Sequence, residues 1–250
     1  MEVERRRGPA TWCCRASLLV GQDAMGDGVL SGIELQRQAL RLYGELVARR
    51  QSWAGRLVFA CGRGVSASGL PAAVSIAGGT SLVLDPDGAA VKAVFRAGGV
   101  DFVVNTLDEA LRVLKNEIRK RRPLSVALEG AVQPALEEMI ERGVLPDLQV
   151  ALEGEREYPG AERLELAREG MVVAPSVELV GWLQERGWVE VAMERATTAE
   201  LRELDARLLA VLPEGDAVRR FWVQRIGHYQ RPVAGGARVV WLTETELAEI

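Results

Sequence analysis

The residue pattern with the clearest chemical meaning is a glycine-rich segment, CGRGVSA, at residues 61–67. It follows an apolar run at 57–60 and precedes a stretch with helical spacing. Gly62, Gly64 and Ala67 satisfy the pattern G-x-G-x-x-[GA], which permits a tight turn, a close backbone approach to a pyrophosphate and close packing of helix on strand. The amides at the start of the following helix attract phosphates. The segment therefore predicts a dinucleotide site, whose candidate loop residues are Gly62, Gly64, Val65, Ser66 and Ala67.

An acidic residue stands where such a site needs one. Asp85 ends the next apolar run, 21 positions after Gly64, and an acid at that distance accepts a hydrogen bond from a ribose hydroxyl. It also favours NAD over NADP, whose additional phosphate prefers a basic residue. Glycine pairs also occur in strand-to-helix turns for steric reasons alone. The pattern therefore leaves two interpretations open, a NAD site and a purely structural turn.

Other reactive residue types have a structural interpretation beside the functional one. His228, the single histidine of the chain, stands with Tyr229 and Arg231 and could form an acid–base cluster or a helix cap. The basic run at 119–122 could hold phosphate or simply end a helix. Cys61 could be reactive near a helix N-terminus, or pack as a small residue. The structural interpretation is the simpler one in each case.

Composition excludes several classes of protein. The 250 residues carry 31 Lys and Arg against 35 Asp and Glu, a net charge of −4, which lacks the basic footprint of a general nucleic-acid binder. No apolar stretch approaches the ~18 residues that suggest a membrane span. Three cysteines without C-x-x-C spacing and one histidine argue against a disulfide framework and a metal site. We expect a cytoplasmic protein without nucleic-acid, membrane or metal partners.

A repeated alternation of apolar runs and amphipathic segments supplies the elements that would position the loop. Short runs that are apolar on both faces suit the strands of a parallel sheet covered by helices on each side. The expected strands are 57–60, 81–84, 101–104, 124–128 and 148–152, and the expected helices between them centre near Ala73, Val91, Val113 and Leu136. The predicted fold class is α/β, a doubly wound, mainly parallel, Rossmann-like sheet with a smaller, mostly helical second part.

The pattern divides the chain into three parts. Residues 1–52 hold an amphipathic helix at 33–50, residues 53–153 form the expected Rossmann-like nucleotide-binding domain, and residues 154–250 form an α-rich second part behind a polar linker. Its expected elements are helices at 177–186, 198–211 and 216–229, a strand at 238–242 and a last short helix. We expect the helix at 33–50 to pack against the C-terminal segment beside the sheet.

Several stretches resemble the urocanase (urocanate hydratase) family. GRLVFACGRGVSASGLPAAVSIAGG, LDEAL and PLSVALEGAVQPALEEMIERGVLPD are similar to its central NAD-binding domain. GVLSGIE upstream, and LDARLLAVLP, FWVQRI and ARVVWL downstream, extend the similarity from Gly28 to Leu242. The resemblance implies a Rossmann-like fold and bound NAD. It also implies the family's chemistry, in which the substrate imidazole forms an adduct with the nicotinamide ring before water is added.

The resemblance also implies roles for particular residues and shows where they depart from the family. Asp85 stands for the family's ribose-binding Glu, and Arg238 matches an arginine that would meet the urocanate carboxylate. Ala131 and the following valine replace an Asn-Ala pair on the cofactor side. The positions where urocanases have glycine hold Val65, Ala67 and Ser68. The family's active-site segment Arg-Gly-Lys-Gly-Pro-Phe-Arg-Trp does not occur in the chain.

These features predict a truncated, diverged urocanase-like protein with a weakened NAD site and no urocanate hydratase activity by itself. Two alternatives stay open. One is a NAD-dependent hydratase or lyase that uses Arg238 to bind a small carboxylate substrate. The other is a structural or interaction protein that keeps the fold without the ligand. The candidate partners are a nucleotide, a small carboxylate and a second copy of the chain in a homodimer.

Overall fold

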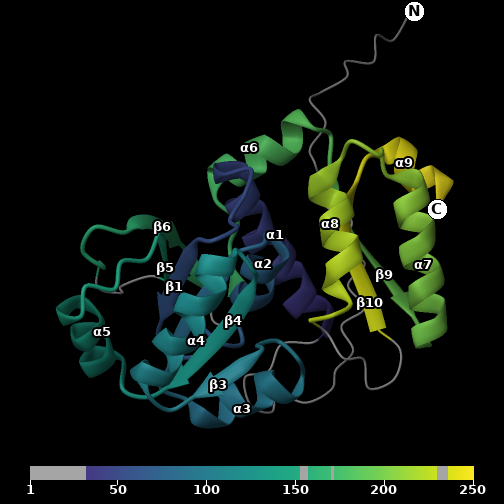
Figure 1. The fold of residues 1–250 in the computed structure, drawn as a ribbon. Coiled ribbons are helices and arrows are strands. Elements are labelled where there is room, and N and C mark those ends of the chain that lie inside the picture. The colour runs from purple at the N-terminus through teal and green to yellow at the C-terminus, as the bar shows by residue number, and fades with distance from the viewer. Residues whose placement is uncertain (1–31, 153–156, 170–171, 230–235) are drawn as a thin grey trace, which may run out of the picture.

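The largest element is a six-stranded parallel sheet (Figure 1) in a computed structural model that describes residues 32–152, 157–169, 172–229 and 236–250. Its strands are β1 (Leu57–Cys61), β2 (Thr80–Asp85), β3 (Phe102–Val104), β4 (Leu124–Glu129), β5 (Leu148–Leu152) and β6 (Glu162–Leu166). Their order is β3-β4-β2-β1-β5-β6, and each neighbouring pair is parallel. The five predicted strands are present, each within one residue of its predicted limits.

Helices cover both faces of the sheet, as a strand that is apolar on both sides requires. Within β1, Val58 and Ala60 belong to one apolar cluster, whereas Leu57, Phe59 and Cys61 belong to a second cluster on the opposite face. The first face carries α1 (Gly32–Arg49), α2 (Leu70–Ile76) and α3 (Gly88–Arg96), and the second carries α4 (Leu107–Lys120) and α5 (Val132–Glu141). This arrangement confirms the doubly wound, Rossmann-like α/β fold.

The chain changes direction across the sheet at β1. Through α2 it leads to β2 on one side of β1, whereas β5 is added on the other side after β3 and β4 have been placed. In open α/β sheets, ligands bind in the crevice at such a reversal of strand order, outside the carboxyl ends of the strands. The glycine-rich segment follows β1 directly and therefore lies at this position.

A sixth strand, which was not predicted, begins in the last two residues of the stretch predicted as a polar linker, 153–163, and continues to Leu166. β6 pairs in parallel with β5 at the edge of the sheet. Only Leu164 and Leu166 of β6 are buried, and its other three residues, Glu162, Arg163 and Glu165, leave no continuous apolar run. An edge strand with one face toward solvent needs only this alternate burial, so its composition resembles that of a loop.

The C-terminal part is built around a two-stranded antiparallel sheet of β9 (Val189–Arg195) and β10 (Gly236–Leu242). The other elements of this part are α6 (Val177–Glu185), α7 (Thr198–Val211), α8 (Ala217–Ile226) and α9 (Glu244–Glu249), with a short pair of β7 (Arg168–Glu169) and β8 (Val172–Val173) before α6. The expected helices and the strand at 238–242 are present. β9 was not predicted, because Glu190, Glu194 and Arg195 interrupt its apolar residues.

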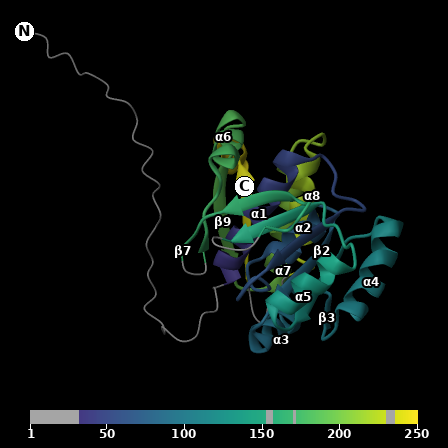
Figure 2. The ribbon, with the colours of Figure 1, turned by 90° about the vertical axis from the view of Figure 1, so that its left-hand side faces the viewer.

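Helix α1 joins the C-terminal part to the sheet. The amide of Gln36 donates to the carbonyl of Ala237 at 2.7 Å and accepts from the backbone N–H of Val239 at 2.7 Å, so it pairs with the backbone of β10. The hydroxyl of Tyr43 donates to the carbonyl of Val218 in α8 at 2.9 Å. The expected contact between the first helix and the C-terminal segment is therefore present. Figure 2 shows α4 and α5 on the side of the sheet away from β9.

Candidate functional site

The glycine-rich loop joins β1 to α2 through a series of tight turns. Gly62 has φ 123° and Gly64 has φ 76°, backbone conformations that disfavour a side chain and so account for glycine at both positions. The N–H of Gly62 donates to the carbonyl of Leu84 in β2 at 3.0 Å. Within the loop, the N–H groups of Val65 and Ala67 donate to the carbonyls of Gly62 and Gly64 at 3.4 and 3.1 Å. Several amides of the loop are thus satisfied by the loop itself.

Asp85 reaches this loop from the end of β2, as its spacing predicts, but its carboxylate is fully buried, with 0% exposure. One carboxylate oxygen, Oδ1, accepts from the N–H of Gly64 at 3.2 Å and from that of Asp87 at 3.0 Å. Oδ2 accepts from the N–H of Ser66 at 3.1 Å and from its hydroxyl at 2.6 Å. Both oxygens are therefore bound to protein groups, and a ribose hydroxyl could reach Asp85 only if these hydrogen bonds broke.

Other side chains of the loop are buried as well. The side chains of Val65, Ser66 and Ser68 are buried, and Val65 belongs to the apolar core. Helix α2 begins at Leu70, so Ala67 stands three residues before the helix. The N–H of Leu70 donates to the hydroxyl of Ser68 at 3.3 Å, and the next residue is Pro71, which has no N–H.

Ala131 lies at the same edge of the sheet, at the end of β4. It is exposed and precedes α5, and its side chain makes no capping hydrogen bond. The neighbouring Gly130 N–H donates to the carbonyl of Asp85 at 3.3 Å, which ties the ends of β4 and β2 together. The sequence therefore brings the loop, Asp85 and Ala131 to one edge, while the methyl side chain of Ala131 offers no hydrogen bond to a cofactor.

The sequence interpretation missed charged residues beside this edge. Glu129 is opposite Asp85 in the register of β4 and β2, and it forms an ion pair with Lys92 of α3 at 3.3 Å. Asp87 caps α3 by accepting from its first-turn amides, and it forms an ion pair with Arg63 of the loop at 3.5 Å. An acid at the end of the buried β4 run was the available signal for Glu129.

Arg238, the predicted substrate-binding residue, is paired with a carboxylate of the protein itself. It lies in β10, is 8% exposed and makes a two-pronged ion pair with Asp205 of α7, with Nε–Oδ1 at 2.6 Å and Nη2–Oδ2 at 2.8 Å. Its third nitrogen, Nη1, donates to the carbonyl of Ala237 at 3.1 Å. In the structure the carboxylate that Arg238 binds is supplied by the protein, and its role toward a substrate stays a prediction.

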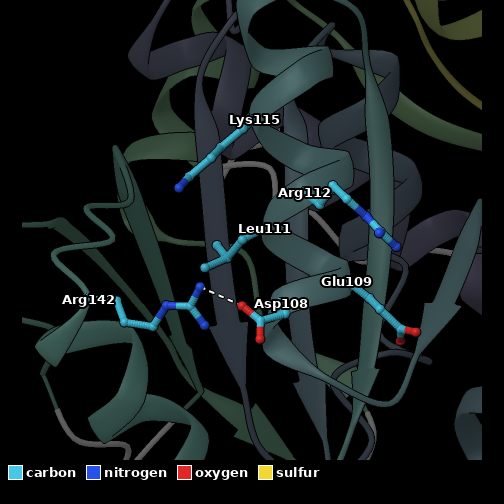
Figure 3. Close-up of a pocket in the computed structure, with 6 residues that line it drawn as sticks. All are labelled: Asp108, Glu109, Leu111, Arg112, Lys115 and Arg142. Carbon is cyan, nitrogen blue, oxygen red and sulfur yellow. Dashed lines mark hydrogen bonds and ion pairs between the residues drawn. The ribbon is translucent and has the colours of Figure 1, made fainter.

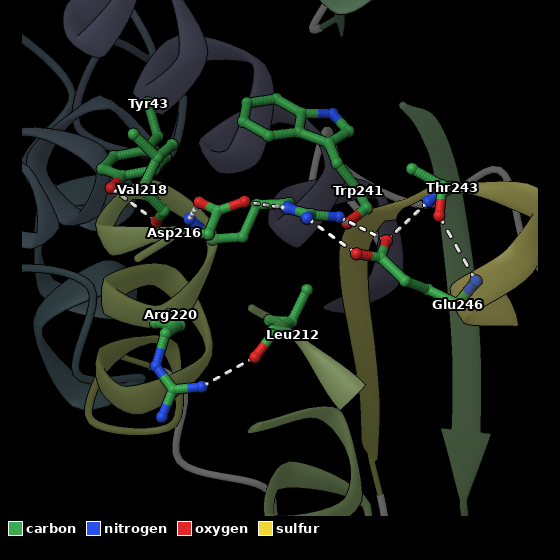
Figure 4. A network of polar contacts seen from close by, with 9 residues as sticks. Tyr43, Leu212, Asp216, Val218, Arg220, Trp241, Thr243 and Glu246 are labelled. Atoms are coloured by element: carbon green, nitrogen blue, oxygen red, sulfur yellow. Dashed lines mark hydrogen bonds and ion pairs between the residues drawn. The ribbon is translucent and has the colours of Figure 1, made fainter. Parts of the chain in front are cut away.

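A second buried arginine, Arg219 of α8, organises the C-terminal part and was not predicted. It is 3% exposed and binds Glu246 through both oxygens, at 2.5 and 2.8 Å, and Asp216 at 2.5 Å. Figure 4 shows the carboxylates of Asp216 and Glu246 at the two ends of this network, with the indole of Trp241 above it. The guanidinium carbon also lies 4.5 Å from the ring centroid of Trp188. A cation held by two carboxylates and an aromatic ring is satisfied within the protein.

The other candidates from the sequence lie in the core, at a helix end or at the surface. Cys61 is buried in the core, and the basic run at 119–122 ends α4, as the simpler interpretation predicted. His228 is exposed and contacts Tyr229 edge-on, with ring centroids 5.2 Å apart, whereas Arg231 lies outside the described residues. Burial raises the pKa of Tyr229, so its phenol stays protonated near neutral pH.

A surface hollow of about 460 Å³ lies over α4 (Figure 3). Arg142 crosses it to form an ion pair with Asp108 at 2.6 Å and also pairs with Glu138 at 2.8 Å. The hollow contains none of the predicted site residues. Across the described ranges, no group of three or more His, Cys, Asp or Glu side chains is arranged to hold a metal ion, and no helix is both long and apolar enough to cross a membrane.

The fit of these residues to NAD can be judged from the loop. A dinucleotide needs free amides for its pyrophosphate and an acceptor for its ribose. Here the amides of Gly64 and Ser66 donate to Asp85, and the carboxylate of Asp85 has no exposed surface. The residues present therefore do not fit the cofactor in this conformation, although the sheet and the position of the loop are those of a dinucleotide-binding fold.

Comparison with known families agrees with the fold and with the segments that resemble urocanases. Residues 33–151 match the model of the urocanase Rossmann-like domain. The match begins in α1 and ends in β5, so it includes the glycine-rich loop, Asp85 and Ala131 and ends before the C-terminal part that carries Arg238. The segment 33–151, just under half of the chain, is therefore similar to the Rossmann-like domain of the urocanase family.

Proposed function

We propose that this chain is a urocanase-like protein that keeps the Rossmann-like domain as a scaffold and does not hydrate urocanate by itself. The observation that carries the proposal is the ion pair of Arg238 with Asp205. Arg238 is the one residue of the chain that matches a substrate-binding residue of the family. The two nitrogens of its guanidinium that would bind a substrate carboxylate, Nε and Nη2, already donate to Asp205. Without a group to hold the substrate carboxylate, hydration lacks the positioning that catalysis needs.

The second part of the proposal is that the affinity for NAD is weak compared with that of a complete urocanase. The donors and the acceptor that the cofactor would use are joined to one another through Asp85, so binding must break these hydrogen bonds before it forms new ones. Each lost charged hydrogen bond costs on the order of 1–3 kcal/mol, so the loss of two or three changes the affinity by several powers of ten. Such a protein acts through its fold, as a structural or interaction module.

The experiment uses the purified full chain. Denaturation followed by mass spectrometry of the released small molecules measures bound NAD, and the absorbance of urocanate measures its hydration with and without added NAD. We expect neither NAD in near-stoichiometric yield nor consumption of urocanate. Consumption that requires NAD would overturn the proposal. In that case Asp205→Asn, which frees Arg238, separates a substrate-binding role from a structural one, because only the former raises activity.

Titration calorimetry with NAD and ADP-ribose tests the affinity separately. We expect dissociation constants well above micromolar for both ligands, and sub-micromolar binding would contradict the weakened site. The assembly and the location of the chain also remain proposals. Light scattering of the purified chain tests the homodimer, and cell fractionation tests the cytoplasmic location.

A further inference from the structure

We infer that the carboxylate of Asp85 occupies the anion site of the glycine-rich loop. It accepts the hydrogen bonds that such a loop offers to a phosphate and holds the loop closed. The inference concerns what fills the loop, and it holds whether or not the chain acts on urocanate. It rests on the arrangement of Gly64, Ser66 and Asp87 around the carboxylate.

The four donors to Asp85 come from two short segments. Ser66 supplies its N–H and its hydroxyl, at 3.1 and 2.6 Å, and Gly64 supplies its N–H at 3.2 Å. The fourth donor is the N–H of Asp87, at 3.0 Å, from the turn that follows β2. Backbone amides that converge on one anion form the kind of concavity that binds phosphate in other proteins. In this chain the anion is part of the polypeptide.

Burial makes this arrangement both stable and selective. The carboxylate of Asp85 has 0% exposure, and hydrogen bonds to a charged acceptor are strong away from water. A phosphate at the same amides would have to displace Asp85 or lie beside it, and two anions that share a buried site repel each other. A ribose hydroxyl has no access either. The loop therefore keeps the glycine pattern of a nucleotide site while it excludes the nucleotide's charge.

The local sequence explains how the loop closes around an internal anion. Ser66 is the donor of the shortest of the four bonds, and its side chain is buried beneath the loop. The hydroxyl of Ser68 donates to the carbonyl of Val65 at 2.7 Å, and this second side-chain hydrogen bond stabilises the turn. These serines and Val65 stand in the segment that a nucleotide-binding loop leaves open, so the closure is built from side chains as well as from backbone.

Anion rescue of Asp85→Ala tests the inference. Removal of the carboxylate leaves four buried donors without an acceptor, and we expect the melting temperature to fall by roughly 5–10 °C. Acetate or inorganic pyrophosphate should then bind the vacated amides and recover about half of that loss in a saturable way, because a ligand that binds only the folded chain stabilises it. Sodium chloride at equal ionic strength should recover none of it.

Asp147→Ala provides the matched control. Asp147, like Asp85, accepts from a backbone amide, that of Leu57 at 2.8 Å, but it pairs with the exposed Arg56 and its own side chain is 23% exposed. Water can therefore replace its carboxylate, and we expect neither anion to stabilise this variant more than it stabilises the unmodified chain. Equal responses of Asp85→Ala and Asp147→Ala, or no response of Asp85→Ala, would overturn the inference.

Hydrogen exchange of the unmodified chain gives a readout that does not depend on the folding of any variant. The amides of Gly64 and Ser66 should exchange slowly, like those of the strands, because they donate to a buried carboxylate. Exchange as fast as that of an exposed loop would contradict the inference. So would a rise in the melting temperature of the unmodified chain on addition of pyrophosphate, since the loop would then have room for a second anion.

Discussion

Asp85 and Arg238 are the two residues whose chemistry the sequence made most specific, and in the structure each is bound to a partner within the chain. Asp85 accepts from the loop, and Arg238 donates to Asp205. A buried charge is tolerated in a protein only when it is paired or well hydrogen-bonded. At the scale of the residue, the same side chains that could serve a ligand are therefore the ones whose removal should cost stability.

Arg238→Ala should lower the free energy of unfolding by about 3 kcal/mol, because it leaves the carboxylate of Asp205 partly buried without its partner. Urea unfolding followed by circular dichroism measures the change. The double variant with Asp205→Ala should recover part of the loss, since no unpaired charge then remains. Arg142→Ala, which removes an exposed arginine with its own two carboxylate partners, should leave the stability nearly unchanged. Equal losses for Arg238→Ala and Arg142→Ala would contradict a buried structural pair.

Glu246 should make the free energy of unfolding depend on pH in the acidic range, with a contribution that is lost as the pH falls. Burial alone raises the pKa of Glu246, but hydrogen bonds from Arg219 and Thr243 outweigh it and hold the pKa below its usual value. A depressed folded-state pKa stabilises the protein fully above the unfolded-state value, which is about 4.3, and this contribution is lost as the pH falls through the folded-state pKa.

Glu246→Gln should therefore be less stable than the unmodified chain at neutral pH and should show a flatter fall of the free energy of unfolding below about pH 4.3. Urea unfolding at a series of pH values measures both effects. Glu244→Gln, a change at an exposed position of the same helix, is the control and should keep the original slope. An unaltered slope in Glu246→Gln would show that the pair with Arg219 does not contribute.

At the scale of the element, α1 and α6 carry interior glycines in opposite environments. In α1, a Cβ at Gly44 would lie 2.7 Å from both the end of the Leu179 side chain and the indole of Trp241. In α6, a Cβ at Gly181 would meet nothing within 4 Å. Gly44 is thus required where α1 approaches α6 and β10 closely, whereas Gly181 has no such role.

Gly44→Ala should destabilise the protein by about 1–3 kcal/mol, because the buried indole of Trp241 must move to admit a methyl group. Gly181→Ala should stabilise it by about 0.5–1 kcal/mol through the lower backbone entropy of alanine in a helix. Thermal unfolding of the two variants measures the difference. A gain in stability for Gly44→Ala would show that the contact of α1 with β10 is loose.

At the scale of the whole molecule, one apolar cluster joins elements that the sequence pattern had divided among three parts. It contains Leu40 and Leu46 of α1, Val58 of the sheet, and Trp222 and Trp241 of the C-terminal part. Elements that share one buried cluster lose their packing together when any of them unfolds. The sheet and the C-terminal part are therefore expected to unfold as one unit.

Heat or urea should unfold the chain in one transition with the same midpoint for every probe. Tryptophan fluorescence reports mainly the C-terminal part, where Trp182, Trp188, Trp222 and Trp241 lie, whereas far-ultraviolet circular dichroism reports all helices and strands. Two separate midpoints would show that the C-terminal part is an independent domain. Calorimetry gives a further check, since the calorimetric and van't Hoff enthalpies of a single unit agree.

The sequence by itself determined the elements whose signals are local. A strand buried on both faces reads as a continuous apolar run, so β1 to β5 could be placed within a residue. The positive φ angles of Gly62 and Gly64 follow from the same kind of local rule, since the turn requires glycine. β6 and β9 were not predicted because charged residues interrupt their apolar residues, and only their neighbours in the sheets show that these residues lie in strands.

The partners of the candidate site residues were decided by the tertiary structure alone. The spacing of Asp85 brings it beside the loop, but the path of the loop determines whether its oxygens meet a ligand or the amides of Gly64 and Ser66. Arg238 meets Asp205 across 33 positions of sequence, on a helix that packs against β10. No local pattern contains that information, because an ion pair depends on where two elements meet in space.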